Sequence, residues 1–172
     1  MRLNESVTIP ALLMDKLKNL LLLLALVFGA IAIFESGARY GASNMRAHAI
    51  ASELQLPLGI YISGNSSMDE PTKAQWAAII DHGIAAGAIH RQLWYINADA
   101  KAHLDKVLSV ALSVRGDGAG KRYELIANSE EKPSGLSGTK LNEIKHAINS
   151  AKAELVDNAP KETALGQPQN TE

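Results

Sequence analysis

Residues 20–34 read LLLLLALVFGAIAIF and carry no charged side chain. With residues 17–19 added, the stretch approaches the roughly 17–25 apolar residues that a helix needs to span a bilayer. A helix satisfies its own backbone hydrogen bonds, which is why such a run is stable in lipid. The stretch predicts a single transmembrane helix or signal anchor over residues 17–35, behind a short N-terminal segment over residues 1–16.

Two other interpretations of this run stay open. Small residues at positions 30 and 32, and again at 36 and 38, suit a signal-peptidase site, so the run also fits a cleaved signal peptide. A buried core helix is the third interpretation, although five consecutive leucines leave it no polar face. Three Lys or Arg residues precede the run and two follow it closely, which favours a cytoplasmic N-terminus. The predicted location is the inner (plasma) membrane, crossed once, with the C-terminal domain extracytoplasmic.

Small residues recur four positions apart in and after the run. Ala25 pairs with Gly29, and Gly37 pairs with Gly41. This spacing lets two helices approach closely in lipid, so these four residues are predicted to pack against a second membrane helix. Gly37 and Gly41 lie beyond the apolar run, where a hinge is the alternative role.

The sequence after the run predicts a helical stalk over residues 36–56. Ala47, Ile50, Ala51 and Leu54 have the i, i+3, i+4, i+7 spacing of one helix face. Pro57 is then expected to end the helix, because a proline pushes the residue before it out of the α region.

Residues 57–128 are predicted to form a small α/β domain. Its helices are expected at about 72–88, where Gly83 and Gly87 would allow close packing, and at 98–114, capped by Asn97 or Asp99. Strands that alternate with crossover helices favour a partly parallel sheet, with a mixed α+β arrangement as the close alternative. Three stretches rich in β-branched and aromatic residues are the expected strands: 58–63 (LGIYIS), 92–97 (QLWYIN) and 121–127 (KRYELIA).

A linker over residues 129–138 leads to an amphipathic helix predicted over residues 139–157. Its apolar positions are spaced 3, 4, 3 and 4 residues apart, which is typical of the narrow seam of a coiled coil. The helix either contacts a partner through this seam or docks lightly on its own domain. The seam residues are Leu141, Ile144, Ile148, Ala151 and Leu155. Residues 158–172, rich in Pro, Gln, Asn, Glu and Thr, are expected to be disordered.

The composition excludes several classes of function. Of the 17 Lys and Arg residues, 14 follow the apolar run, together with 16 of the 18 Asp and Glu residues. A nucleic-acid-binding protein needs clustered positive charge, so this near balance argues against one. Cysteine is absent, which excludes disulfides, thiolate zinc sites and cysteine nucleophiles.

No catalytic or metal-binding motif is evident. Asp99 and His103 are the only potential metal ligands at i, i+4 spacing, and no HExxH motif accompanies them. The glycine-rich stretch at 116–122 (GDGAGKR) lacks the first Gly and the Ser/Thr of a phosphate loop, and it is expected to precede a strand rather than a helix. We therefore predict no catalytic, cofactor or metal site, and whether the protein is an enzyme stays open.

Trp94 and Tyr95 are adjacent in the second expected strand, so one ring should face the core and the other should face outward. An exposed ring of this kind can serve as a binding anchor. A core residue beside a single exposed ring is the simpler interpretation.

Together these features predict a single-pass membrane protein of the cell envelope. It would be a structural or assembly component of a membrane complex of the secretion, pilus or conjugation type. Its partners would be the bilayer and other envelope proteins, or further copies of itself, but not nucleic acid. One alternative is an envelope hydrolase that uses Glu70, Asp81, His82 and His103, and another is a secreted binding domain released by signal cleavage.

Overall fold

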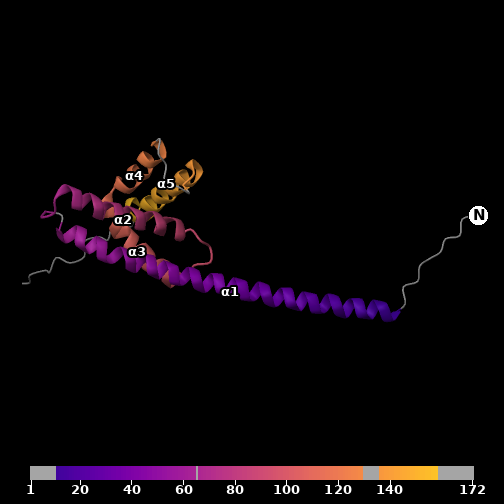
Figure 1. Ribbon diagram of the computed structural model, residues 1–172. Coiled ribbons are helices and arrows are strands. Elements are labelled where there is room, and N and C mark those ends of the chain that lie inside the picture. Colours follow the sequence, from indigo (N-terminus) through magenta and orange to yellow (C-terminus); the bar gives the residue numbers. More distant parts are fainter. Residues whose placement is uncertain (1–10, 65, 130–135, 159–172) are drawn as a thin grey trace, which may run out of the picture. The chain divides into compact units, whose positions relative to one another are not determined.

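The computed structural model describes residues 11–64, 66–129 and 136–158, and it divides the chain into two compact units, Met1–Gly41 and Ala42–Glu172. Each unit is described by itself. Within the described residues, every regular element is helical and no strand occurs. The elements are α1 (Ala11–Gly64), α2 (Glu70–His90), α3 (Ala98–Arg115), α4 (Gly118–Asn128), α5 (Gly138–Lys152) and the short π-helix η1 (Ala153–Asp157) (Figure 1).

The predicted α/β (or α+β) domain is wrong, because none of its three strands exists. Residues 58–63 form the last turns of α1, residues 92–97 form the connection between α2 and α3, and residues 121–127 lie in α4. β-Branched and aromatic residues prefer strands only weakly, and packing at helical spacing overrides that preference. Leu58 and Tyr61, three residues apart, are both buried on one face of α1. The glycine-rich stretch likewise opens a helix, α4, rather than a strand.

Pro57 does not end the first helix, contrary to expectation, and lies inside α1. A proline inside a helix removes one backbone hydrogen bond and crowds the preceding turn. Burial offsets this cost here, since Pro57 is buried together with its neighbours Leu54 and Leu58. The predicted stalk, residues 36–56, is helical throughout, but from Ala42 onward it belongs to the second unit and supplies part of its core.

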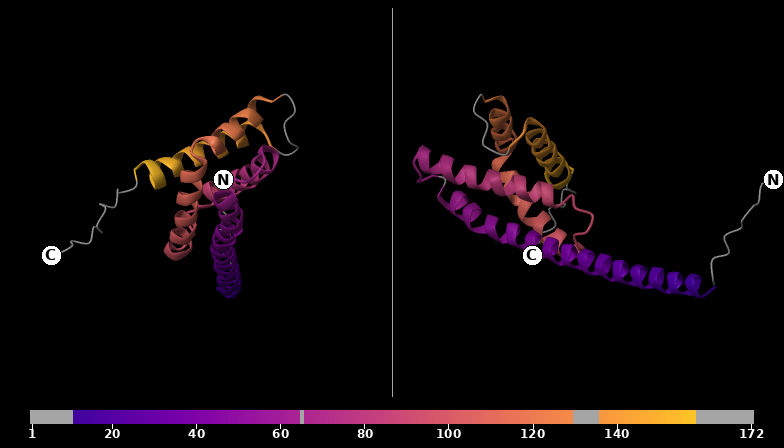
Figure 2. Two further views of the ribbon diagram at one scale, coloured as in Figure 1. Left: turned by 90° about the vertical axis from the view of Figure 1, so that its left-hand side faces the viewer. Right: turned by 45° about the vertical axis from the view of Figure 1, so that its right-hand side comes forward.

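The second unit is a helical bundle with one continuous apolar core. Its central helix, α2, contacts α3, α4 and α5, and Figure 2 shows α4 and α5 lying side by side. The core is a set of stripes at helical spacing, one from each long helix. The largest of its fully buried apolar side chains are Leu54, Ile80, Ile84, Leu104, Leu108, Leu112, Leu141 and Ile148.

Two glycines let the helices approach closely, as their place beside the apolar stripe of α2 predicts. A Cβ atom on Gly83 would lie 2.4 Å from Leu54 Cδ2, and one on Gly87 would lie 2.8 Å from Leu108 Cδ2. α1 and α3 therefore pack so closely against α2 at these two positions that any side chain larger than glycine would clash.

Polar side chains define where these helices begin. Asn97 accepts a hydrogen bond from the Ala100 amide (2.7 Å), which confirms the first of the two expected caps of α3. Asp69 caps α2 by accepting from the Thr72 amide, one residue before the helix begins. α3 ends at Gly116, whose φ of 54° lies in the left-handed region that favours glycine.

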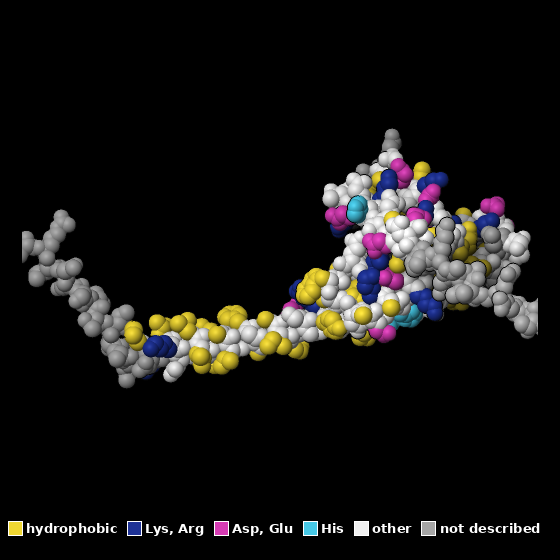
Figure 3. Space-filling view, turned by 180° about the vertical axis from the view of Figure 1, so that it is seen from behind, with side chains coloured by type: hydrophobic (Ala, Val, Ile, Leu, Met, Phe, Trp, Pro, Cys, Tyr) yellow, Lys and Arg dark blue, Asp and Glu magenta, His cyan; other side chains and the backbone are white. Residues whose placement is uncertain are grey.

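The first unit consists, within its described part, of the N-terminal portion of α1. Its large apolar side chains between Leu17 and Phe34 are 43–77% exposed, and Figure 3 shows them along this portion of the helix. By length and composition, α1 is the one helix among the described residues that could cross a membrane. None of the apolar window is buried, so the run does not act as a core helix within this chain. Most of the predicted segment 1–16 and of the predicted tail 158–172 lies outside the described residues.

Candidate functional site

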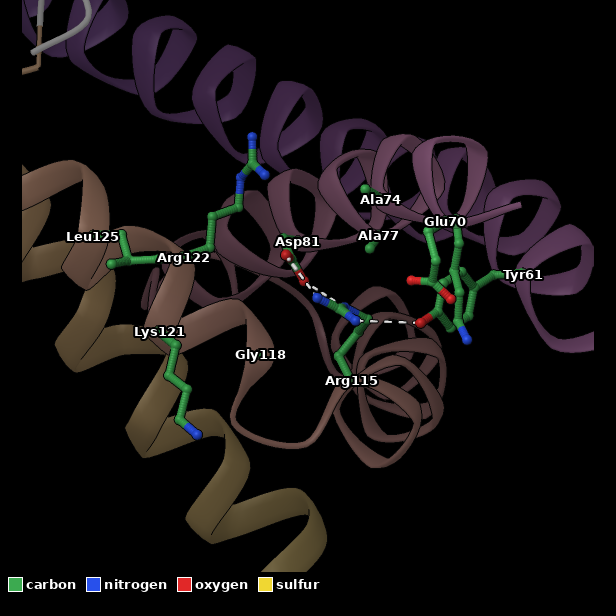
Figure 4. A pocket seen from close by; sticks show the side chains of 11 residues that line it. Tyr61, Glu70, Ala74, Ala77, Asp81, Arg115, Gly118, Lys121, Arg122 and Leu125 are labelled. Carbon is green, nitrogen blue, oxygen red and sulfur yellow. Dashed lines mark hydrogen bonds and ion pairs between the residues drawn. The ribbon is translucent and has the colours of Figure 1, made fainter. Parts of the chain in front are cut away.

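The second unit contains a cavity of about 400 Å³ beside the C-terminal end of α1 (Figure 4). Side chains from α1, α2, α3 and α4 form its walls. They are Tyr61, Glu70, Lys73, Ala74, Ala77, Asp81, Arg115, Gly118, Lys121, Arg122 and Leu125. Among the described residues, it holds the most deeply buried charged side chain.

That charge is Asp81, which is 2% exposed and fully engaged by Arg115. Arg115 Nε and Nη2 donate to the two carboxylate oxygens over 2.7 and 3.0 Å. Arg115 also donates to the Tyr61 hydroxyl over 3.4 Å, and its guanidinium lies 5.7 Å from the centre of the Tyr61 ring. A buried carboxylate is costly unless it is paired, and this bidentate pair supplies the partner. Because both oxygens are occupied, Asp81 is not presented as a general base.

Two pKa shifts follow from this arrangement. The hydrogen bond with Asp81 raises the pKa of Arg115 despite the opposing effect of burial, so the guanidinium stays charged. Burial raises the pKa of the Tyr123 hydroxyl; the charge of Arg122 opposes this shift and that of Asp81 adds to it. Both groups keep their protons at neutral pH, so neither is suited to abstract a proton.

The rim of the cavity carries an excess of positive charge. Within the described residues, Lys73, Lys121 and Arg122 form no ion pair, whereas Glu70 is the one carboxylate that lines the cavity besides Asp81. In Figure 4 Lys121 and Arg122 point in different directions from α4. The cations therefore do not converge on one point, as they would in a dedicated phosphate or carboxylate site.

The residues of the hydrolase hypothesis are not brought together. Glu70 and Asp81 line the cavity, but His82 is exposed on α2 and does not line it. His103 lies on α3 and contacts residues of α1 instead. The geometry needed for concerted acid and base chemistry is therefore missing in the described part of the chain.

His103 forms a polar cluster that sequence reasoning missed. His103 Nδ1 lies 3.1 Å from His48 Nδ1, and its Nε2 lies 3.4 Å from Gln55 Nε2. Asp99 Oδ2 is 3.9 Å from His48 Nε2. The two histidines are 55 positions apart, so no local spacing signals their pairing. No set of three or more potential metal ligands occurs among the described residues, so this pair is not a complete metal site.

A second buried cation joins three elements of the bundle. Arg91, at the end of α2, donates to Asp105 of α3 over 2.8 Å and to Glu154 of η1 over 2.9 Å. Burial alone would raise the pKa of Asp105, but hydrogen bonds from Arg91 and Lys101 outweigh it and hold this pKa below its usual value. The cluster is a structural clamp, since its groups bind one another rather than face a cavity.

The predicted seam of the C-terminal helix is occupied by the chain itself. Leu141, Ile148 and Ala151 are buried in the core of the second unit, and Ile144 and Leu155 are half-buried against it. α5 packs on α2 and α4, which is the alternative of docking on its own domain. The seam is therefore not a free surface, and contact with a separate partner along it has no support in this arrangement.

The predicted membrane-packing residues lie in the first unit and remain available. Ala25, Gly29, Gly37 and Gly41 are exposed, and a Cβ atom on any of the three glycines would meet no atom within 4 Å. No described residue occupies this face, so its packing against another helix stays a prediction.

The chain matches none of the protein-family models, curated proteins or solved structures with which it was compared.

Proposed function

We propose that this protein is held in a lipid bilayer by residues 17–34 of α1 and that its helical domain acts as a structural or assembly component of a membrane complex. One observation carries the proposal: the large apolar side chains of this stretch are 43–77% exposed. Each such side chain left in water forgoes roughly 1.5–3 kcal/mol of burial free energy. Lipid would supply that burial along the whole stretch, on every face of the helix.

Charges at both ends of the stretch support its use as a membrane span. Lys16 and Lys18 are exposed on one side, and the Glu35–Arg39 ion pair (2.8 Å) is exposed on the other. Eighteen helical residues rise about 27 Å, close to the hydrocarbon thickness of ~30 Å. The bias of basic residues favours a cytoplasmic N-terminus, and with it an extracytoplasmic domain on the inner (plasma) membrane.

The polar groups of the second unit support a structural rather than a catalytic role. Its buried charges, Asp81 and Arg91, are both consumed in ion pairs that link helices. No constellation of base, nucleophile and positioned acid occurs in the described residues. The complex would be of the secretion, pilus or conjugation type, with other envelope proteins or further copies of this chain as the partners.

Membrane extraction tests the anchor. We expect the full chain to stay in the membrane pellet after washing with alkaline carbonate, with an intact mass of 18.4 kDa. Replacing Leu22 and Val27 by Arg adds about 2.5–3.5 kcal/mol to insertion for each charge and should release the chain, whereas the same change at exposed Glu53 should not. A soluble chain whose intact mass shows cleavage after Ala32 or Ala38 would overturn the proposal and favour the secreted binding domain.

Orientation and partners need separate measurements. The chain has no cysteine, so Ser66→Cys creates a single exposed thiol. A membrane-impermeant maleimide should label this thiol from the extracytoplasmic side. Labelling only after the inner membrane is broken would show that the domain lies in the cytoplasm instead. Purification in mild detergent should then retain stoichiometric partner proteins, or a homo-oligomer, if the domain serves an assembly.

A further inference from the structure

Trp94 is the most exposed large apolar side chain in the described part of the molecule. It is 90% exposed, although tryptophan is on average a highly buried residue type. It lies in the connection between α2 and α3, beside the half-buried Tyr95, with the two rings edge to face at 88° and 5.3 Å between centroids. The exposed ring therefore projects from a turn rather than from a strand.

The connection is held firmly to the bundle. Backbone hydrogen bonds tie Gln92 to Ile89 over 3.2 Å and Leu93 to His90 over 3.1 Å. Ile96 packs against the core, and Arg91 forms the buried clamp with Asp105. Trp94 is thus presented by an ordered turn, which means that little additional ordering is needed when its ring meets a partner.

Both ends of this turn are fastened to the first residues of the second unit. His90 Nε2 lies 2.8 Å from the backbone oxygen of Ser43, and the Asn97 amide donates to Asn44 Oδ1 over 2.8 Å. Ser43 lies only nine positions along the chain from Phe34, the last residue of the apolar run. Nine residues rise about 14 Å in a helix, and even fully extended they reach only about 32 Å. The chain itself therefore keeps Ser43, to which the turn is fastened through His90, within that reach of the predicted bilayer surface.

We propose that Trp94 and Tyr95 enter the headgroup layer of the bilayer and form a second contact of the protein with lipid, which rests on the anchoring proposed above. Indole and phenol rings have an apolar body and a polar edge, and they are enriched at both membrane interfaces for that reason. Tyr40, on the connecting stretch and 46% exposed, suits the same layer. This contact would limit the movement of the domain about its anchor.

Quenching by brominated lipids tests this contact. The chain has two tryptophans, so W76F leaves Trp94 as the only indole, and W94F leaves the half-buried Trp76 as the matched control. Both full-length variants are placed in vesicles of equal parts phosphatidylcholine and phosphatidylglycerol. Bromine lies near the carbonyl end of the acyl chains in one set of vesicles and near the methyl end in the other.

The shallow bromine should remove on the order of half of the Trp94 emission and the deep bromine clearly less, because interfacial rings sit at headgroup depth. Trp76 should lose little emission to either lipid. If W76F does not fold, a nitroxide on Gln92→Cys in the wild-type background reports the depth of the same turn. A spin label as accessible to a water-soluble relaxation agent as one on Ser66→Cys would overturn the proposal.

The outcomes separate this inference from the anchor. If the vesicles float with the protein but Trp94 is quenched by neither lipid, the anchor stands and the lipid contact is wrong. If Trp94 emission shifts to the blue only when a co-purified protein is present, the ring is a protein-binding anchor and the lipid contact is equally wrong. If the protein does not float, both proposals fail together.

Discussion

α1 contains two apolar stretches that meet opposite fates. Residues 20–34 are apolar on every face and exposed. Residues 43–61 instead bury one stripe of apolar side chains spaced mostly three or four positions apart, which consists of Ala47, Ile50, Ala51, Leu54, Leu58 and Tyr61. In the second stretch Arg46 and Glu53 are exposed, so one face of the helix remains in contact with water. Periodicity rather than mean hydropathy therefore separates a stretch that needs lipid from one that needs a protein core.

The ion pairs of the two units differ in the same way. The Glu35–Arg39 pair of the first unit has side chains 57% and 71% exposed. The Asp81–Arg115 pair of the second unit has side chains 2% and 16% exposed. Water screens the first pair much more than the nearly buried second pair, so we expect very different contributions to stability.

The largest expected effect comes from breaking the buried pair. Arg115→Met leaves the Asp81 carboxylate buried without a partner and should lower the free energy of unfolding by about 3–5 kcal/mol. Arg39→Met, the matched change in the exposed pair, should cost about 1 kcal/mol at most. Urea unfolding in detergent, followed by far-UV circular dichroism, measures both.

Removing both members of the buried pair sharpens this test. The double variant Asp81→Leu with Arg115→Met should recover most of the lost stability, because no uncompensated charge remains. A double variant as unstable as Arg115→Met alone would mean that packing around Tyr61, not charge, holds this part of the bundle.

A second test compares two leucines of the same helix. Leu54 is 2% exposed, so Leu54→Ala should open a cavity and cost about 2–5 kcal/mol of unfolding free energy. Leu22 is 65% exposed, so Leu22→Ala should leave the unfolding curve of the domain unchanged. Equal losses at the two positions would show that residues 17–34 are packed against protein in the native assembly.

The sequence predicts an element of this fold more reliably when more residues of that element share one pattern. The apolar run and α3 each rest on many positions that agree. The run lies in one helix and is exposed, as a membrane helix would be, and α3 matches its predicted range of 98–114 to within one residue. The expected strands rested on six or seven residues each, where strand preference and a short helical stripe look alike. Pro57 was misjudged because a local rule was applied where burial against distant residues decides.

The polar pairs and clusters could not be predicted from the sequence for a related reason. Asp81 meets Arg115 across 34 positions, and His48 meets His103 across 55. No spacing rule links residues so far apart until the helices are placed. The seam of α5 was found as a set of residues, but its spacing could not say whether a partner or the chain itself covers it. The single exposed ring at Trp94 was anticipated only as one of two possible faces.

A third test uses glycines. Gly83→Ala gains helix propensity but drives a methyl group into Leu54, so we expect a net loss of about 1–3 kcal/mol of unfolding free energy. Gly59→Ala has no atom within 4 Å of the new methyl group and should gain roughly 0.5–1 kcal/mol. If both substitutions stabilise, the approach of α1 to α2 is looser than the structure has it. Thermal unfolding of the two variants in one detergent makes the comparison.

The smallest effect is a difference in pH dependence between the two units. The pKa of Asp105 lies below its usual value in the folded domain because hydrogen bonds from Arg91 and Lys101 outweigh its burial. In the unfolded chain the pKa of an aspartate is about 4. Because the pKa of Asp105 is lower in the folded domain, its charge stabilises the fold at pH values above about 4. This stabilisation disappears as the pH falls through the pKa of the folded domain. The domain should therefore lose stability below about pH 4.

Asp105→Asn isolates this contribution. The asparagine keeps an acceptor for Arg91 but removes the charge, so it should lower the free energy of unfolding by about 1 kcal/mol at neutral pH. The free energy of unfolding should also change less with pH below about pH 4 than it does in the wild type. Glu154 still pairs with Arg91 in the variant, which keeps the loss small. Membrane attachment should not follow the same curve, because residues 20–34 contain no titrating group. If acid released the protein from vesicles in step with unfolding, the folded domain rather than the apolar stretch would be what holds it there.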